Sequence, residues 1–459
     1  MPLPEATNWR GRWWLPRGPD ETEEPVSGVL SFGDRFQLEL DSSIEGPVPG
    51  LGSYSFERLE YPLMWGLVPD VGQVTLVDSY GSGFRYGDTN QWLQVTGVIS
   101  GAWLSQGELT FDQLQISTDY LWDWAHPAPV ATSFGKDGFP FGLGSEVLIE
   151  AQVGESTVRL TTIYSGELTD LRLEVETNPY WIIDLSPAHS LRECIANWGA
   201  RLRDMTAFLT AQPDRITLVA ARPTGFDRRL DVYVPLLTDR LPPRRGRRLI
   251  DIDQILLRGH FDDAALVGAW FRWSAEHPNV LTRLHAVDMA PFIFAEHRIA
   301  SIVQVAEALH LALYNHKMIP SAEHRARVGE SVKDLPEQLK QWAEPILMRS
   351  NGLPFWLRMT ELLNRAVEFG LPRGPADAER FGREIAEIRH PEAHGGMAAS
   401  TDAETQNLRV QGLAWVIRTV LLGTLGVPND VISARLLNNQ DFEWMANHLG
   451  WASASAADA

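Results

Sequence analysis

The chain has 459 residues, of which 44% are hydrophobic and 22% charged, values typical of a globular protein that argue against wholesale disorder. Its 40 lysines and arginines stand against 59 aspartates and glutamates, and the resulting net charge of −19 excludes a general polyanion binder, because non-specific nucleic-acid affinity comes from a basic surface. The single cysteine, Cys194, excludes an intramolecular disulfide and is typical of a cytosolic chain.

Short segments that alternate apolar and polar residues fill the first part of the chain. Residues 28–32 and 36–40 alternate around Gly33, Asp34 and Arg35, which is the signature of a β-hairpin. The same alternation recurs at 74–78, 92–99, 109–117, 146–153, 157–164 and 171–176. Many short strands between glycine turns predict a β-sandwich or an open barrel.

A helical segment and a basic segment follow the strands. Apolar residues recur at spacings of three and four over 190–210, which predicts a helix, and residues 216–221 and 230–236 resemble two more strands. The most basic stretch of the chain is 239–248, with Arg244, Arg245, Arg247 and Arg248. We interpret it as a solvated linker stiffened by proline, with a phosphate-contacting arm as the alternative.

From Asp251 onward the pattern is helical. The apolar spacing predicts helices over 263–276, 294–315, 335–348, 356–369, 376–390 and 403–425. Proline- and glycine-rich breaks at 370–375 and after Gly426 separate some of these elements. The segment from Leu413 to Val427 is the most apolar of the chain, but Arg418 interrupts it, so we expect a buried helix of a soluble bundle.

These elements predict a multidomain α+β protein. We expect a β-rich domain resembling a sandwich or barrel over 1–248, a helical connector over 249–290 and an all-α bundle over 291–451. The small residues of 452–459 predict a disordered tail. The amino terminus lacks the apolar run of a secretory signal, and no segment reaches the ~18 apolar residues of a membrane span, so we expect a cytoplasmic protein without membrane contact.

An arginine and a histidine near the end of one predicted helix can act together on a phosphodiester. Arg389 and His394 are five residues apart, and His390 adds a second imidazole. A guanidinium presents a fixed fork to phosphate oxygens, and an imidazole can take a proton from a ribose 2′-OH or give one to the leaving 5′-oxygen. Because Pro391 disfavours helix in the residue before it, we expect the helix to end at His390 and the chain to bend there.

The spacing by itself is weak evidence, because Arg272 and His277 repeat it. Such a pair is more often structural, with the histidine stabilised at a helix carboxyl terminus and the arginine on the surface. The second pair is favoured by His390, by the glycines at 395 and 396 that allow close approach, and by the two long predicted helices around it.

The segment Arg389-His390-x-x-x-His394 resembles the Arg-polar-x-x-x-His signature of the HEPN superfamily. The resemblance implies an all-α bundle in which the motif lies at the end of a helix and faces its copy in a homodimer. It also implies a metal-independent endoribonuclease with no cofactor. In that site Arg389 would hold the scissile phosphate, His394 would act as general base or acid, and His390 would orient His394 or contact the substrate.

The amino-terminal segments Gly-Arg-Trp-Trp-Leu-Pro (11–16) and Pro-Val-Ser-Gly-Val-Leu-Ser-Phe (25–32) are similar to the opening of the ApeA N-terminal domain. This domain followed by a HEPN domain is the architecture of bacterial antiphage defence proteins. The resemblance implies a ribonuclease toxin that acts on host RNA, with transfer RNA among the candidates, and that leaves 2′,3′-cyclic phosphate ends. A phage-derived trigger would be sensed by the N-terminal domain.

An RNA substrate would need a local basic rim, because the acidic chain repels polyanions. Arg380 and Arg383 lie one to three helical turns before Arg389 and are candidates for this rim. The linker residues Arg244, Arg245, Arg247 and Arg248 are a second set of candidates.

The alternative from another functional class is a non-enzymatic binding protein. Its aromatic β domain would bind carbohydrate or a phage protein, and its helical bundle a nucleotide or a partner. Glu307 and His310, on the predicted helix 294–315, can line the same cleft as Arg389 or pair on the helix surface. The acidic residues near His260 and His297 lack the spacing of metal ligands, so no metal is expected.

Overall fold

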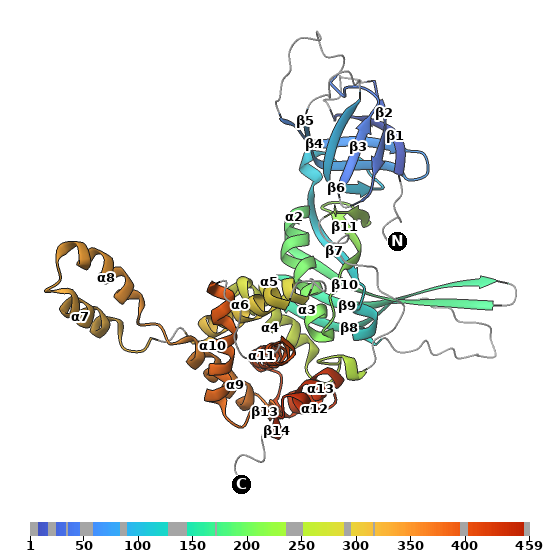
Figure 1. Cartoon of the computed structure of the whole chain (residues 1–459). Helices are drawn as coiled ribbons and strands as arrows, with labels where there is room; N and C mark the ends of the chain where they lie inside the picture. Colours follow the sequence, from blue (N-terminus) through green and yellow to red (C-terminus); the bar gives the residue numbers. More distant parts are fainter. Residues whose placement is uncertain are drawn as a thin grey trace. The chain divides into compact units, whose positions relative to one another are not determined.

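The computed structural model describes residues 8–16, 24–33, 35–45, 58–82, 90–126, 145–169, 172–235, 251–288, 295–314, 317–394 and 403–453. The chain forms two compact units, the first made of 1–249 with 263–268 and the second of 250–262 with 269–459 (Figure 1). The first unit is rich in strands and the second is helical, so the predicted α+β class is confirmed. In the described ranges, no helix is long and apolar enough to cross a membrane.

The amino-terminal strands form a closed antiparallel barrel. Its members are β1 (Asn8–Trp14), β2 (Val26–Ser31), β3 (Phe36–Leu40), β4 (Arg58–Val68), β5 (Gly72–Ser82) and β6 (Gln91–Ser100). Closure occurs because β3 pairs with β6 as well as with β2. The predicted hairpin of 28–32 and 36–40 is therefore confirmed as β2 and β3. Trp13 fills the core fully buried, and it fits because Gly66 leaves room: a Cβ there would lie 2.3 Å from the indole ring.

Six further strands extend the sheet in the order β6-β12-β11-β7-β10-β9-β8. They are β7 (Thr110–Thr118), β8 (Ser145–Val153), β9 (Ser156–Thr169), β10 (Arg172–Ser190), β11 (Ile216–Pro223) and β12 (Leu230–Tyr233). The predicted helix over 190–210 is confirmed as the consecutive segments α2 (Leu191–Glu193), η2 (Cys194–Gly199) and α3 (Ala200–Thr210). These segments cover one sheet face closely, since a Cβ at Gly199 would lie 3.6 Å from Ile216 Cδ1. Two short helices, η1 (Gln106–Glu108) and α1 (Leu121–Ala125), flank β7 along the chain.

The helical part contains ten α-helices in the described residues. They are α4 (Asp263–Glu276), α5 (Pro278–Asp288), α6 (Ala295–Leu313), α7 (Ser321–Val332), α8 (Glu337–Arg349), α9 (Phe355–Glu368), α10 (Ala378–His394), α11 (Ala403–Thr424), α12 (Asn429–Leu437) and α13 (Gln440–His448), after the short helix η4 (Asp251–Asp253). All six helices predicted from apolar spacing are present. Sequence analysis did not identify α5, α7, α12 and α13, which are short. The segment expected to be a buried helix lies largely in α11, where Leu413, Val416 and Val420 are fully buried.

Helix α10 does not end where the sequence predicted. The expected end at His390 is wrong, because the helix continues through Pro391 to His394. Pro391 costs α10 one N–H donor. Ile385 and Ile388, which precede it, are buried one turn apart and hold that part of α10 against the bundle. Helix α8 likewise contains Pro345.

The carboxyl-terminal residues contribute one more pairing. Ala452 and Ser453, which the sequence assigned to the tail, form β14 and pair with β13 (Arg373–Gly374). Residues 454–459 and the basic segment 239–248 lie outside the described residues.

Candidate active site

Arg389 lies near the carboxyl end of α10, where it contacts two other helices. Its guanidinium carbon is 4.5 Å from the centroid of the Phe355 ring on α9. Its Nη2 is 3.3 Å from the carboxylate oxygens of Glu307 on α6. The ring covers one face of the guanidinium in a cation–π contact, and the carboxylate accepts a hydrogen bond from one edge. The Arg389 side chain remains 42% exposed, so part of the cation faces solvent.

Glu307 has two cationic neighbours. Besides Arg389, its Oε1 lies 3.7 Å from Nη1 of Arg358, which is one turn after Phe355 on α9. Arg358 is in turn held by a hydrogen bond of 2.9 Å from its Nε to the carbonyl oxygen of Leu353. Two guanidiniums share one carboxylate, so this group of three carries a net charge of +1 in a chain of −19.

His310 forms a separate pair beside these residues. It lies three residues after Glu307 on α6, a spacing that puts both side chains on one helix face. Its Nε2 is 2.6 Å from Oε2 of Glu361 on α9, and its side chain is buried. Of the two weaker sequence candidates, Glu307 therefore contacts Arg389, whereas His310 pairs with Glu361.

Sequence reasoning missed Phe355, Arg358 and Glu361. A signal for them was available, because these residues repeat every three positions along α9, while Glu307 and His310 show the same spacing on α6. Two helices with matched i, i+3 polar positions are candidates for a shared interface of ion pairs.

His390 and His394 lie on the last turns of α10. On a continuous helix, five residues separate Arg389 and His394 by about 7.5 Å along the axis. The motif is therefore carried by one helix rather than by a helix and a loop. The side chains of His390 and His394 and the glycines at 395 and 396 lie outside the described residues.

The two candidate RNA-binding arginines of α10 have acidic partners. Nε of Arg380 is 3.0 Å from Glu384 Oε1, and Nη2 of Arg383 is 2.5 Å from Glu379 Oε1. Arg383 also stacks over the Trp356 ring at 4.2 Å. Each arginine is paired with a carboxylate one turn away, but Glu384 also lies 3.3 Å from Nε of Arg409 on α11, so Arg380, Glu384 and Arg409 together carry a net charge of +1. The other candidates, Arg244, Arg245, Arg247 and Arg248, lie outside the described residues.

The competing pair, Arg272 and His277, lies near the end of α4. Arg272 is exposed on α4, four residues before the last residue of the helix, Glu276, and His277 follows that helix. The His277 ring lies 5.1 Å from the Trp273 ring, and its backbone N–H donates to the Trp273 carbonyl at 2.9 Å. These contacts fit the structural interpretation of that pair. Across the described ranges, no three histidine, cysteine, aspartate or glutamate side chains gather as metal ligands would.

Two family models match the chain. The model described as ApeA N-terminal domain 1 matches residues 8–218, and the model described as Apea-like HEPN matches residues 300–431. The second match spans most of α6 and all of α9 and α10, and therefore includes Glu307, Arg389 and His394. Neither the curated proteins nor the solved structures gave a match.

Proposed function

Because the chain has the two-domain architecture of ApeA proteins, an ApeA N-terminal domain followed by an ApeA-like HEPN domain, we propose that it is an antiphage defence protein that cleaves host RNA without a metal. Domains of the HEPN family are generally ribonucleases. The observation that carries the proposal is the setting of Arg389: a half-exposed guanidinium that two neighbouring helices hold in place, five residues before His394 on the same helix.

The contacts of Arg389 suit a phosphate-binding role. Phe355 covers one face and Glu307 one edge, so the planar fork is oriented before substrate arrives. A preorganised cation stabilises developing negative charge without having to reorganise during the reaction. Since Arg358 shares Glu307, the carboxylate does not cancel the positive charge that a phosphodiester would meet.

His394 would supply the proton transfers. In the proposed reaction the substrate's 2′-oxygen attacks phosphorus, and the bond from phosphorus to the 5′-oxygen breaks. A base takes the 2′-OH proton, and an acid gives a proton to the 5′-oxygen. The products are a 2′,3′-cyclic phosphate and a 5′-hydroxyl, and no water is consumed. His390 would orient His394 or contact the RNA.

A dimer would complete this site. One His394 cannot be base and acid in the same step, whereas two copies related by a two-fold axis supply both groups. HEPN domains often dimerise, and we propose that this chain does so through that domain. Transfer RNA is our candidate substrate, and the N-terminal domain would receive the phage-derived trigger.

A ribonuclease assay in EDTA on the purified full chain tests this function. We expect cleavage to persist in EDTA, cyclic phosphate ends to form, and His394→Ala to reduce the rate by ~10²–10⁴-fold, the usual cost of removing a positioned acid or base. Arg389→Ala should have a comparable effect. Arg272→Ala and His277→Ala are matched controls with the same spacing, and they should retain activity.

The same assay also distinguishes the alternative hypotheses about the site and the function. Loss of activity only in the Arg272 and His277 variants would place the site at the end of α4. A folded wild-type chain that binds RNA but never cleaves it would favour the non-enzymatic binding protein.

A further inference from the structure

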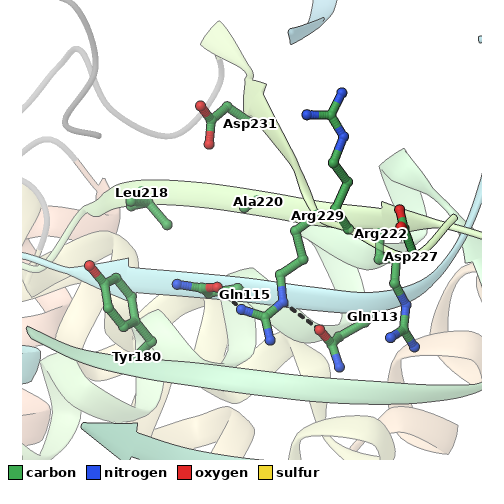
Figure 2. A pocket seen from close by; sticks show the side chains of 10 residues that line it. Gln113, Gln115, Tyr180, Leu218, Ala220, Arg222, Asp227, Arg229 and Asp231 are labelled. Carbon is green, nitrogen blue, oxygen red and sulfur yellow. Dashed lines mark hydrogen bonds between the residues drawn. The ribbon is translucent and has the colours of Figure 1, made fainter. Parts of the chain in front are cut away.

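The first unit contains a polar pocket of about 530 Å³ (Figure 2). Strands β7, β10, β11 and β12, with the turn before β12, contribute its lining. Its volume lies within the range of roughly 300–1,000 Å³ that is usual for small-molecule sites. Nothing in the proposed RNA chemistry accounts for it.

Strand register builds one wall of the pocket. Alternate residues of a strand face opposite sides, and on β7 the buried Leu114 and Ile116 face the layer formed by η2 and α3. Gln113 and Gln115 face the other side, where they line the pocket. Gln113 lies in register with Arg222 of β11, and Gln115 lies opposite Ala220 of the same strand.

Arg229 spans the two glutamines. Its Nε donates to Gln113 Oε1 and its Nη1 to Gln115 Oε1, and Figure 2 shows this side chain reaching across to Gln113. Only 8% of each glutamine is exposed. Burial lowers the pKa of Arg229 and the nearby positive charge of Arg222 lowers it further, whereas the Asp184 carboxylate opposes this shift. A cation in this position gains from a bound anion.

Three arginines, Arg222, Arg228 and Arg229, line the pocket together with two aspartates, Asp227 and Asp231. Since Arg222 also forms an ion pair with Asp112, the formal charges balance, and an anion would be held by individual guanidinium donors rather than by a net positive charge. The Nε of Arg222 donates to Asp112 at 2.7 Å, and Nη2 of Arg228 donates to the Gly101 carbonyl at 2.7 Å. A guanidinium has five N–H donors, more than these contacts use. The pocket therefore offers several charge-assisted donors to one anion.

The two ends of the pocket differ in chemistry. Strands β10 and β11 both run antiparallel to β7, so Tyr180 and Leu218 lie at one end and Arg222 at the other. Figure 2 shows Tyr180 and Leu218 at this same end of the pocket. Four residues separate Leu218 from Arg222, which is about 13 Å of strand. A ligand that fits both ends has an anionic group and a flat ring.

We propose that this pocket binds a nucleoside phosphate, with the phosphate on the arginines and the base against Tyr180. The Asp231 carboxylate, on the strand next to Ala220, would accept a hydrogen bond from a sugar hydroxyl or a base amino group. The N-terminal domain would thereby bind a small nucleotide, separately from any RNA that the helical domain cleaves.

Calorimetric titration of the full chain with 5′-AMP, 5′-GMP, 5′-CMP and 5′-UMP tests the proposal, with adenosine and inorganic phosphate titrated in parallel. We expect at least one mononucleotide to bind, adenosine not to bind, and phosphate to bind more weakly. Arg222→Met should weaken nucleotide binding about 10- to 100-fold, the usual loss for a hydrogen bond to a charged group. Arg10→Met, an exposed arginine on β1, is the matched control and should leave binding unchanged.

Tyr180→Leu tests the ring end separately. It should weaken mononucleotide binding and leave phosphate binding unchanged. Equal affinity for phosphate and for every nucleotide would overturn the proposal in favour of a free-phosphate site. The absence of binding at millimolar nucleotide, or unchanged affinity in a folded Arg222→Met variant, would overturn it entirely. Binding is read without ribonuclease activity, so an inactive helical domain would not affect this test.

Discussion

At the residue scale, Glu307 determines how Arg389 is presented. Its carboxylate lies 3.3 Å from Arg389 and 3.7 Å from Arg358, so one acid positions two cations. The acid does not need to touch the RNA for its loss to slow cleavage. Glu307 acts by orienting the guanidinium of Arg389. The Phe355 ring alone would hold this group less firmly, since a contact with its face leaves the guanidinium free to rotate in its own plane.

We predict that Glu307→Gln lowers kcat about tenfold, because the charge-assisted contact that orients Arg389 is replaced by a weaker one. KM should not rise, since the variant leaves two uncompensated guanidiniums that attract RNA. Glu368→Gln, which breaks an exposed ion pair with Arg365 on α9, is the control and should leave both constants unchanged. An unchanged kcat in Glu307→Gln would show that Glu307 does not position Arg389.

Asp214 gives the first unit a pH dependence of its own. The carboxyl is fully buried, and its Oδ1 accepts a hydrogen bond from the Tyr120 backbone at 3.1 Å. Burial raises its pKa from the ordinary 3.8 to about 8. Between pH 3.8 and about 8, the Asp214 carboxyl holds a proton in the folded chain that it has released in the unfolded chain. The stability contributed by this group is therefore complete below the unfolded pKa and is lost as pH rises towards 8.

We predict that Asp214→Asn reduces the loss of stability between pH 5 and pH 8. Asparagine keeps the oxygen that accepts from Tyr120 but has no proton to release, so its thermal unfolding temperature should exceed that of the wild type most clearly at pH 8. Asp70→Asn, in the exposed turn between β4 and β5, should follow the wild-type curve. Parallel pH curves for Asp214→Asn and the wild type would show that the carboxyl is ionised in the folded chain.

At the element scale, helices α7 and α8 form a hairpin whose base is tied by contacts of Asn351. Its side chain accepts from the Ile319 N–H at 3.0 Å and donates to the Ile319 carbonyl at 2.9 Å. On α8, Leu339, Trp342 and Ile346 recur at spacings of three and four and therefore share one face. Trp342 is 68% exposed. An exposed apolar face of this kind marks an interaction surface.

A second copy of the chain suits this face. An antiparallel pair of α8 helices would place Leu339, Trp342 and Ile346 of one copy against the same three side chains of the other. A two-fold interface uses one surface patch on both subunits, as this arrangement does.

We predict that Trp342→Ser weakens self-association at least tenfold, because truncating a buried interface tryptophan typically costs 2 kcal/mol or more. Sedimentation velocity over a concentration series measures this loss. Trp444→Ser, at a half-exposed tryptophan of α13, is the matched control and should dimerise like the wild type. A wild-type chain that is monomeric and fully active at working concentration would contradict both this surface and the two-copy site.

At the scale of the whole molecule, charge distribution limits how RNA can bind. The net charge of −19 repels a polyanion, whereas the group of Glu307, Arg358 and Arg389 has a local excess of one positive charge. On α10, Glu379 offsets the charge of Arg383, whereas Glu384 is shared by Arg380 and Arg409, which leaves a second group with an excess of one positive charge. Binding must therefore draw on few cations, and those in the basic segment 239–248 remain the richest source in the chain.

We predict that log affinity for RNA falls linearly with log salt, at about −0.7 per phosphate contact for single strands. Replacing Arg244, Arg245, Arg247 and Arg248 with glutamine should flatten this slope and weaken binding without abolishing cleavage at saturating RNA. The double variant Arg380→Gln and Arg383→Gln should change the slope less, because both arginines are already paired. An unchanged slope in the quadruple variant would leave 239–248 as a solvated linker, and a flat slope in the wild type would count against RNA as the ligand.

Local sequence patterns determined much of the secondary structure of this protein. Apolar alternation located the β2–β3 hairpin, and apolar spacing located six helices of the bundle, because strands and helices impose periods of 2 and 3.6 residues on neighbouring positions. The spacing of Arg389 and His394 along the sequence identified them as a candidate pair. The resemblance to the HEPN and ApeA families indicated both domains that the family models match.

Only the tertiary structure decided what surrounds those residues. Glu307, Phe355 and Arg389 belong to three helices, and no local period relates positions so far apart in the chain. Closure of the barrel by β3 and β6 is likewise a long-range pairing. Helix α10 continues through Pro391 to His394, although a proline disfavours helix in the residue before it. The contacts of Arg389 and the closure of the barrel join segments that are distant along the chain, so local sequence patterns do not determine them.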